Sequence, residues 1–288
     1  MAILCYISLL LLNLSCDTPE KIEEKITTPH LQKILDLPAE CAETSGAIVY
    51  DSLLWTFNDS GNDPVLFGIS FESGEIISVV TLTNAENTDW EDIAQDETSI
   101  YIGDFGNNYG DRQDLVIYKI AKGDMDGSET QNVSCEEIAF HYADQTDFEA
   151  EYNATSFDCE AMFILNSEIY ILNKDWINET CTLYILQEGT EDFVAQKVTD
   201  LPVEGLVSGA DIHQSKTKLV VCGYRQYIPF IVQLNIDDSE NLTASFDFRV
   251  DFPDQIGNQI EGVFYMGDQI MLTNENKVVP QALWQFKP

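Results

Sequence analysis

Basic side chains are scarce in this chain of 288 residues, in which 14 Lys and Arg stand against 50 Asp and Glu, giving a formal net charge of −36. A surface of this charge repels nucleic acids and anionic lipid headgroups, and it attracts cations. Nucleic acid is therefore excluded as a partner. Two interpretations of the acidic surface stay open, solubility in a salty medium and specific cation binding, and both can hold together.

Several catalytic and metal-binding motifs are also missing. Histidine occurs three times, no CxxC pair is present, and five cysteines remain after residue 16, so a zinc site is not expected. The chain contains no Gly-x-Ser-x-Gly elbow and no phosphate-binding loop of the Walker type. No nucleophile–base constellation stands out from the sequence.

The only long apolar run of the sequence is residues 1–15. It is too short to span a bilayer but typical of a signal peptide. It ends at Asn13-Leu14-Ser15-Cys16, which resembles a loose bacterial lipobox with Cys16 as the lipidated residue. An ordinary secretory signal with an incidental cysteine is the alternative. Residues 16–30 are rich in charge and predict a flexible tether. We therefore expect an extracytoplasmic lipoprotein of the bacterial cell envelope, which contacts the membrane through the lipid on Cys16.

A degenerate repeat organises residues 31–288, with a period of about 45–70 residues. A short phrase of small or acidic residues opens a strand five times, at Thr44-Ser45-Gly46, Trp90-Glu91-Asp92, Cys159-Glu160-Ala161, Ser208-Gly209-Ala210-Asp211 and Ile260-Glu261-Gly262. A polar phrase follows each opening, at Asn58-Asp59-Ser60-Gly61, Gly103-Asp104-Phe105-Gly106, Asn173-Lys174-Asp175, Gly223-Tyr224-Arg225 and Thr273-Asn274-Glu275. Short alternating strands repeated in this way predict an all-β fold, a β-propeller.

Each repeat accommodates four strands, and the first predicts strands at Gly46–Tyr50, Leu53–Asn58, Val65–Phe71 and Ile76–Leu82. The fifth repeat ends after Ala282–Phe286 and lacks an outer strand. The segment Leu31–Leu37 has the length to supply it, which would close the ring and remove exposed edges. We predict a single domain of five four-stranded blades. Six blades are the alternative if the interval Glu91–Glu160 contains a degenerate blade.

Alternating strand directions within a blade bring both sets of phrases to one mouth of the central channel. Carboxylates held close together repel, so such a ring needs a counter-ion, a cationic ligand or raised pKa values. Ca²⁺ suits it because this ion takes about six to eight oxygen ligands. The candidate ligands are Asp59, Glu91, Asp104, Glu160, Asp211, Glu261 and Glu275. The alternative is structural, since Asp and Asn after a strand also stabilise turns.

The phrases around Asp59, Glu91, Asp104 and Glu160 resemble those of secreted or lipid-anchored propellers from Bacteroidota-type bacteria. More distantly, they are similar to SdiA-regulated and phytase-like or esterase-like propellers. The resemblance covers most of residues 31–288. Phytase-type propellers use Ca²⁺ at an acidic mouth to hydrolyse phosphate monoesters, whereas this chain has few basic residues to receive a highly anionic substrate.

Three functions follow as hypotheses. The first is a monomeric binding propeller whose Ca²⁺-loaded mouth recognises a small molecule, a glycan or a protein. The second is a Ca²⁺-dependent hydrolase of phosphate or carboxylic esters. In it Glu91, Glu160 or Glu261 activates a metal-bound water, and Lys174 or Arg225 stabilises the oxyanion. Lys174 has an alternative role, the neutralisation of Glu160. The third hypothesis is a structural scaffold of the envelope.

Overall fold

The computed structural model describes residues 28–190, 192–239 and 242–288. The expected signal peptide, Cys16 and most of the tether therefore lie outside the described residues. The described part contains 21 strands and three short 3-10 helices. None of its helices has the length and apolar character needed to cross a membrane.

Hydrogen bonding groups the strands into sheets of four, eight, four and five strands. We describe them below in groups of four that begin at the opening phrases, and we call these groups units. The first unit is β2 (Thr44–Tyr50), β3 (Leu53–Asn58), β4 (Val65–Ser70) and β5 (Ile76–Leu82). The second is β6 (Trp90–Gln95), β7 (Ser99–Asp104), β8 (Val116–Ala121) and β10 (Glu136–Tyr142). The third is β11 (Asp158–Leu165), β12 (Glu168–Lys174), β13 (Cys181–Glu188) and β14 (Phe193–Leu201).

The last two units complete the ring. The fourth is β15 (Leu206–Ile212), β16 (Lys218–Arg225), β17 (Ile228–Asp237) and β18 (Thr243–Asp251). The fifth is β19 (Ile260–Met266), β20 (Gln269–Asn274), β21 (Ala282–Lys287) and β1 (His30–Asp36). Three 3-10 helices lie in the connections, η1 (Ala39–Cys41), η2 (Lys122–Asp124) and η3 (Pro253–Gln255).

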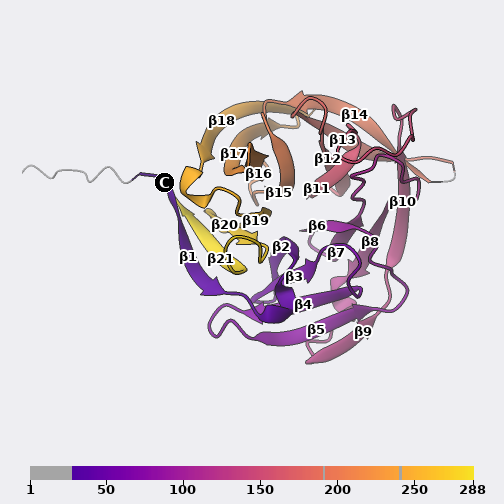
Figure 1. Cartoon of the computed structure of the whole chain (residues 1–288). Coiled ribbons are helices and arrows are strands. Elements are labelled where there is room, and N and C mark those ends of the chain that lie inside the picture. The colour runs from indigo at the N-terminus through magenta and orange to yellow at the C-terminus, as the bar shows by residue number, and fades with distance from the viewer. Residues whose placement is uncertain (1–27, 191, 240–241) are drawn as a thin grey trace, which may run out of the picture.

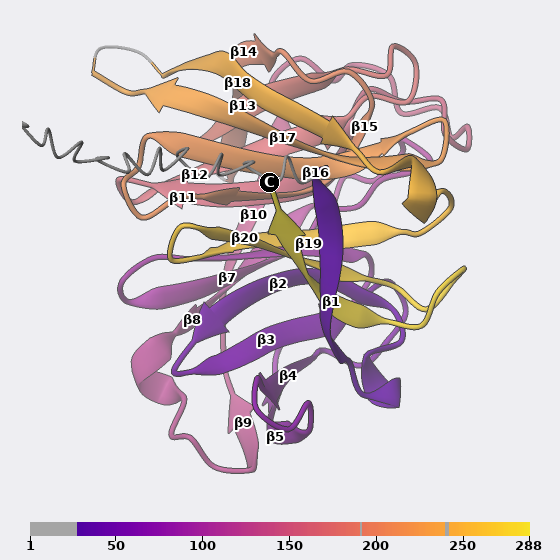
Figure 2. The same ribbon diagram turned by 90° about the vertical axis from the view of Figure 1, so that its left-hand side faces the viewer.

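The innermost strands β2, β6, β11, β15 and β19 contact one another in a closed cycle, and the units surround this common centre (Figure 1). Figure 2 shows the units side by side, with their connections gathered at the two ends. Two parallel pairings were not predicted. The pairing of β10 with β14 joins the second and third units into one eight-stranded sheet, and β9 (Thr130–Val133) extends the first unit by pairing with β5.

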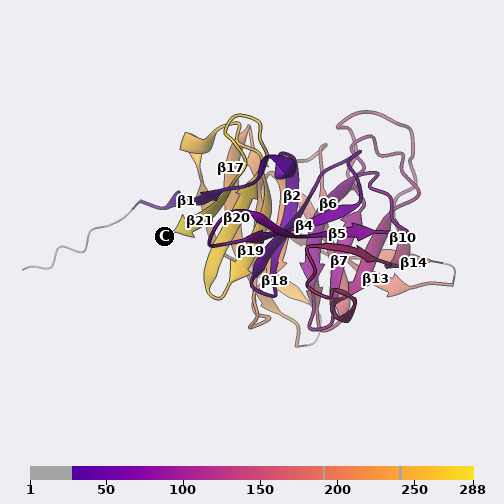
Figure 3. The same cartoon turned by 90° about the horizontal axis from the view of Figure 1, so that it is seen from below.

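The N-terminal strand closes the ring, as predicted. β1 pairs with β21 in antiparallel register from His30–Lys287 to Asp36–Ala282, beside the C-terminus (Figure 3). The contact continues past the strand, where the Leu37 amide donates to the Gln281 carbonyl at 3.1 Å. The first and last strands of the described chain thus protect each other's edges.

The apolar core is divided among the units. Five clusters of buried side chains lie between neighbouring units. Between the first and second units, for example, Phe57 and Trp90 meet edge to face with ring centroids 5.4 Å apart. Each unit therefore buries both faces of its sheet against its neighbours, which holds the polar ends of the innermost strands in fixed positions.

The pairing of each innermost strand with the second strand of its unit shifts in register near the start of the innermost strand. This shift accounts for the small or acidic residues of the opening phrases. The residues within the shifts are Ser45 with Gly46, Glu91, Glu160, Ser208 and Glu261. A β-bulge of this kind re-aims a side chain. The following position is Ala or Gly in four of the five strands, and Asp92 occupies it in β6. Strands of neighbouring units approach closely at this point: a Cβ atom on Gly262 would lie 2.8 Å from the Ser45 carbonyl oxygen.

Candidate functional site

The five bulges lie at one end of the ring axis, where the innermost strands begin; we call this end the mouth. At two of them the side chain is a serine that serves the fold. The Ser45 hydroxyl donates to the Glu91 carbonyl at 2.5 Å, and the Ser208 hydroxyl donates to the Ile260 carbonyl at 2.8 Å. At the other three the side chain is a glutamate, which leaves Glu91, Glu160 and Glu261 buried at the mouth.

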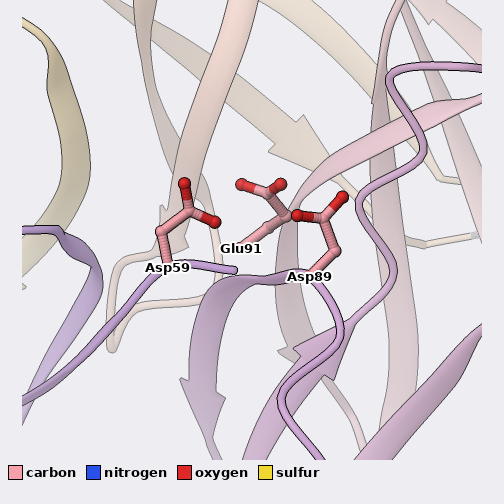
Figure 4. A group of neighbouring side chains, drawn as sticks. All are labelled: Asp59, Asp89 and Glu91. Carbon is pink, nitrogen blue, oxygen red and sulfur yellow. The ribbon is translucent and has the colours of Figure 1, made fainter. Parts of the chain in front are cut away.

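Asp59, Asp89 and Glu91 form the tightest acidic group, which we call the carboxylate triad. One carboxylate oxygen from each lies within 4.8 Å of the others, and the three side chains point toward one another (Figure 4). Asp59 follows β3, whereas Asp89 and Glu91 flank Trp90 at the start of β6. The triad thus joins the first two units at the mouth.

Donors are missing around two members of the triad. The Ser60 amide donates to Asp59, but none of the described residues donates a hydrogen bond to the carboxylate of Asp89 or Glu91. The neighbouring Gly106 makes room for these two carboxylates, because a Cβ atom at this position would overlap Glu91 Oε1 and Asp89 Oδ2. Its own amide donates to the Asp89 carbonyl at 3.2 Å, which fixes the loop against the triad.

Burial and mutual repulsion alter the acidity of the triad. Burial raises the pKa of Glu91 well above its usual range, and the charges of Glu160 and Asp59 add to the rise. Burial, together with the charge of Asp59, raises the pKa of Asp89 to about 7. Burial also raises the pKa of Asp59, although the Ser60 amide opposes it. Without a cation, Asp89 and Glu91 therefore retain protons at pH values at which ordinary carboxylates, with a pKa of about 4, have already lost them.

Lys174 is paired inside the mouth. Its Nζ atom lies 2.9 Å from Glu160 Oε1, and both side chains are buried. The ammonium also lies 4.8 Å from the ring centre of Trp176 and 5.3 Å from that of Tyr224. Burial alone would lower the pKa of Lys174, but the surrounding acidic groups, of which Glu160 acts most strongly, together raise it. Lys174 is thus held as a charged partner of Glu160.

Glu261 and Glu275 belong to the same mouth. The side-chain amide of Gln259 donates to Glu261 Oε1 at 3.3 Å. Burial raises the pKa of Glu261 to about 8, although the charge of Lys174 acts to lower it. Burial also raises the pKa of Glu275, whose Oε2 atom lies 3.2 Å from Lys277 Nζ without hydrogen-bond geometry. The repulsion of Asp59 acts on both glutamates, so they are electrostatically connected to the triad.

Three predicted site residues occupy other positions. Asp104 accepts the amides of Thr88 and Asp89 at 3.1 Å each and pairs with Arg112 at 2.9 Å, so it positions the triad. Asp211 lies near the other end of its strand, where its Oδ2 atom accepts the Tyr265 amide at 2.7 Å. Arg225 forms an exposed pair with Glu204 at 2.6 Å.

Two acidic residues that were not predicted as site residues contribute to the mouth. Asp89 belongs to no repeated phrase, although it directly precedes one; its place in the acidic run Asp89-Trp90-Glu91-Asp92 was the available signal. Asp158 is fully buried and accepts the Asn107 amide at 2.6 Å and the Trp176 indole at 2.7 Å. Asp158 therefore ties together two loops of the mouth.

Asp92 lies below the mouth and points toward the ring axis. Its Oδ2 atom accepts the Met162 amide of β11, and its Oδ1 atom accepts the Ile93 amide, both at 2.8 Å. The Ala210 amide of β15 acts to lower the pKa of this carboxylate, although burial raises it overall. This side chain thereby connects β6 with β11. In the mouth above it, the carboxylates of Asp89 and Glu91 have no hydrogen-bond donor among the described residues.

No protein-family model matches the chain, and no curated protein matches it in sequence. Among solved structures it is similar to the PQQ-bound aldose sugar dehydrogenase of Streptomyces coelicolor, at 8% identity over 90% of this chain and 98% of that chain, with a TM-score of 0.52. A luciferin-regenerating enzyme matches at 10% identity over 91% and 96% of the two chains, with a TM-score of 0.48. The Dos1 propeller matches at 12% identity over 80% and 52%, with a TM-score of 0.40. Identities this low concern the fold alone, which is all-β and of the β-propeller type.

Proposed function

We propose that this chain is a five-bladed binding propeller whose carboxylate triad holds Ca²⁺ at the mouth. The observation that carries the proposal is the triad, in which three carboxylates from two units lie within 4.8 Å and two of them have no donor among the described residues. Burying ionised groups without partners is costly. A divalent cation removes this cost, whereas water alone would leave the charges to repel one another.

The oxygen-only chemistry of the triad favours Ca²⁺ among common cations. Asp59, Asp89 and Glu91 supply carboxylate oxygens, and Ca²⁺ accepts about six to eight oxygens in an adaptable arrangement. Any coordination positions that the triad leaves open are available to water or to a ligand approaching the mouth. The ion would therefore serve both to stabilise the mouth and to present a ligand-binding face.

Binding is better supported than ester hydrolysis. A hydrolase needs a cationic group free to stabilise the oxyanion. Lys174 is buried against Glu160, and Arg225 pairs with Glu204 at the rim. Both cations suggested for that role are thus already engaged. The structural scaffold, the third hypothesis, requires neither metal nor turnover and provides no reason for an unpaired triad.

The setting of this function is part of the same proposal. Cys16 would carry the lipid that holds the domain at a bacterial membrane, outside the cytoplasm. A net charge of −36 opposes self-association, in keeping with a monomer.

Calorimetric titration of residues 17–288 with Ca²⁺, after treatment with a chelator, tests the proposal. We expect one bound ion and a higher melting temperature, and we expect Glu91→Gln to weaken binding by about tenfold or more, which corresponds to ~1.4 kcal/mol. Asp211→Asn is the control, since that carboxylate lies near the other end of its strand. Absence of both Ca²⁺ heat and thermal stabilisation would refute the metal site. Ca²⁺-dependent turnover of chromogenic phosphate or acyl esters, lost in Glu160→Gln, would instead support the hydrolase.

A further inference from the structure

Exposed apolar side chains gather around the mouth. Among the described residues, seven large apolar side chains are more than half exposed. Six lie on loops at the mouth, and the seventh, Phe246, lies on the outer strand β18. We call the six the apolar collar; they are Tyr109, Tyr152, Ile177, Tyr227, Ile256 and Val278.

The collar follows the repeat of the fold. Tyr109, Ile177, Tyr227 and Val278 each lie in the loop after the second strand of a unit, in the second to fifth units respectively. The corresponding turns at the opposite end carry no such side chain within the described ranges. Scattered apolar residues are ordinary on a protein surface, but a concentration at one end marks an interaction site.

Tyr227 occupies a backbone conformation that tyrosine rarely adopts. It has a φ of 67° in the two-residue turn between β16 and β17, a position favoured by glycine and asparagine. The equivalent residue of a turn at the opposite end, Ser167 with a φ of 69°, is small and polar. Tyr227 is three-quarters exposed, so packing within this chain does not account for the choice. Strain of this kind concentrates at functional positions.

Tyr109 and Tyr152 form a shared aromatic surface beside the acidic centre. Their ring centroids are 5.2 Å apart. The Glu151 amide donates to the Tyr109 carbonyl at 3.1 Å, which fixes the two loops together. The adjacent Asn108 side chain donates to Asp158 at 2.8 Å, which ties the surface to the mouth. This part of the collar is therefore held in place before any partner arrives, which reduces the entropic cost of binding.

Charge selects the kind of partner. Acidic side chains are concentrated at the mouth, and the whole chain carries a net charge of −36. A second copy of the chain and an anionic lipid surface would both be repelled. A protein segment that presents Lys or Arg among apolar residues would be attracted, and its cations could also contact the tyrosine faces.

We propose that the mouth face docks a basic and apolar segment of a partner protein. Its Lys or Arg side chains lie over the mouth carboxylates, and its apolar side chains pack on the collar. Aromatic residues at the centre of an interface commonly supply most of its binding energy, with charge complementarity supplying specificity. This inference rests on the proposed binding function and names the class of partner.

Selection of a displayed random peptide library on residues 17–288 in Ca²⁺ buffer tests the inference. We expect the selected peptides to combine Lys or Arg with apolar residues. A variant that combines Tyr109→Ser, Tyr152→Ser and Tyr227→Ser should bind them about tenfold more weakly or worse. Phe246→Ser is the matched control, because it removes an equally exposed aromatic ring outside the collar. Melting temperatures check that the variants fold.

Several outcomes would overturn the inference. They are no enrichment of peptides, enrichment of acidic or neutral peptides, and equal binding by the collar variant. Light scattering that shows a dimer lost in the collar variant would assign the face to a second copy, and collar-dependent binding of neutral glycans would assign it to carbohydrate. Ca²⁺ calorimetry separates the two proposals. If the protein binds Ca²⁺ but selects no peptide, only the docking inference fails. If it binds peptides through the collar but shows no heat of Ca²⁺ binding, only the metal site fails.

Discussion

Glu91 and Asp92 are neighbours in β6, and both are buried, but their surroundings differ. The Asp92 carboxylate accepts backbone amides of Met162 and Ile93 at 2.8 Å, whereas no described residue donates to the carboxylate of Glu91. Burial raises the pKa of both groups well above the usual range. The two residues thus share burial and a raised pKa, and they differ in the hydrogen-bond donors around their carboxylates. A carboxylate with donors serves the fold, whereas one without donors is left for a ligand.

The same contrast divides the two ends of the innermost strands. Asp211 resembles Asp92, since it accepts the Tyr265 amide of the next unit. Asp89 resembles Glu91, since it is crowded by other carboxylates without a donor to its oxygens among the described residues. The comparison teaches that the acidic residues of the innermost strands and of the loops before them have two roles. One role is to hold neighbouring units together, and the other is to gather negative charge at the mouth.

Asp92→Ala should have the largest effect, on stability. It leaves the amides of Met162 and Ile93 buried without an acceptor, at about 1–3 kcal/mol each. We expect the free energy of unfolding to fall by about 2–6 kcal/mol, measured from urea unfolding. Glu91→Ala, measured in chelator, serves as the control and should be far less destabilising. Equal losses in the two variants would show that hydrogen-bond donors do not distinguish these carboxylates.

The opening phrases predicted the fold because they record a backbone requirement. A bulge and close contacts between units need small or polar residues at the same point of each innermost strand, as at Ser45 and Gly262, and this leaves a visible repeat. The chain closure was predictable from the missing outer strand. The pairings of β9 with β5 and of β10 with β14 depend on how neighbouring units meet, which no local pattern records.

The site was predicted less completely than the fold. Glu91, Glu160 and Glu261 occupy equivalent bulges, so the repeat revealed them. Asp89 is held in the triad because its backbone amide donates to Asp104. This contact joins a loop to a strand, and the spacing of residues in the sequence does not show it. Asp211 was misplaced because it lies two residues beyond Gly209 in its strand, too far along to reach the mouth.

Glu91→Gln should produce the second largest effect, and its sign should depend on Ca²⁺. A ligand at a hundred times its Kd stabilises the native state by ~2.7 kcal/mol. The variant should lose most of this gain because it lacks one ligand of the ion. In chelator the variant should melt above the unsubstituted chain, because a carboxylate has been removed from a crowded site. Melting curves in Ca²⁺ and in chelator would show this crossing, and two parallel shifts would contradict it.

A smaller effect should appear in the pH dependence of stability. The folded-state pKa of Asp89 is raised to about 7. The folded chain therefore keeps a proton that the unfolded chain has released, and stability of the metal-free protein should fall as pH rises from about 4 through about 7. Bound Ca²⁺ ionises the triad and should flatten this fall, with protons released on binding near pH 6. Melting temperatures that vary with pH identically in Ca²⁺ and in chelator would place Asp89 outside the metal site.

The smallest effect should come from Asp211→Asn, and it is the most direct test of the comparison. Burial raises the pKa of Asp211 to about 7, the same value as that of Asp89. Asparagine keeps an oxygen that can accept the Tyr265 amide, so we expect stability to change by about 1 kcal/mol or less. Ca²⁺ affinity should stay within about twofold, whereas Asp89→Asn should lower it by about tenfold. Calorimetric titration of the two variants side by side measures the difference. If both weaken Ca²⁺ binding equally, acidity rather than position governs the response, and the distinction between the mouth and the rest of the ring fails.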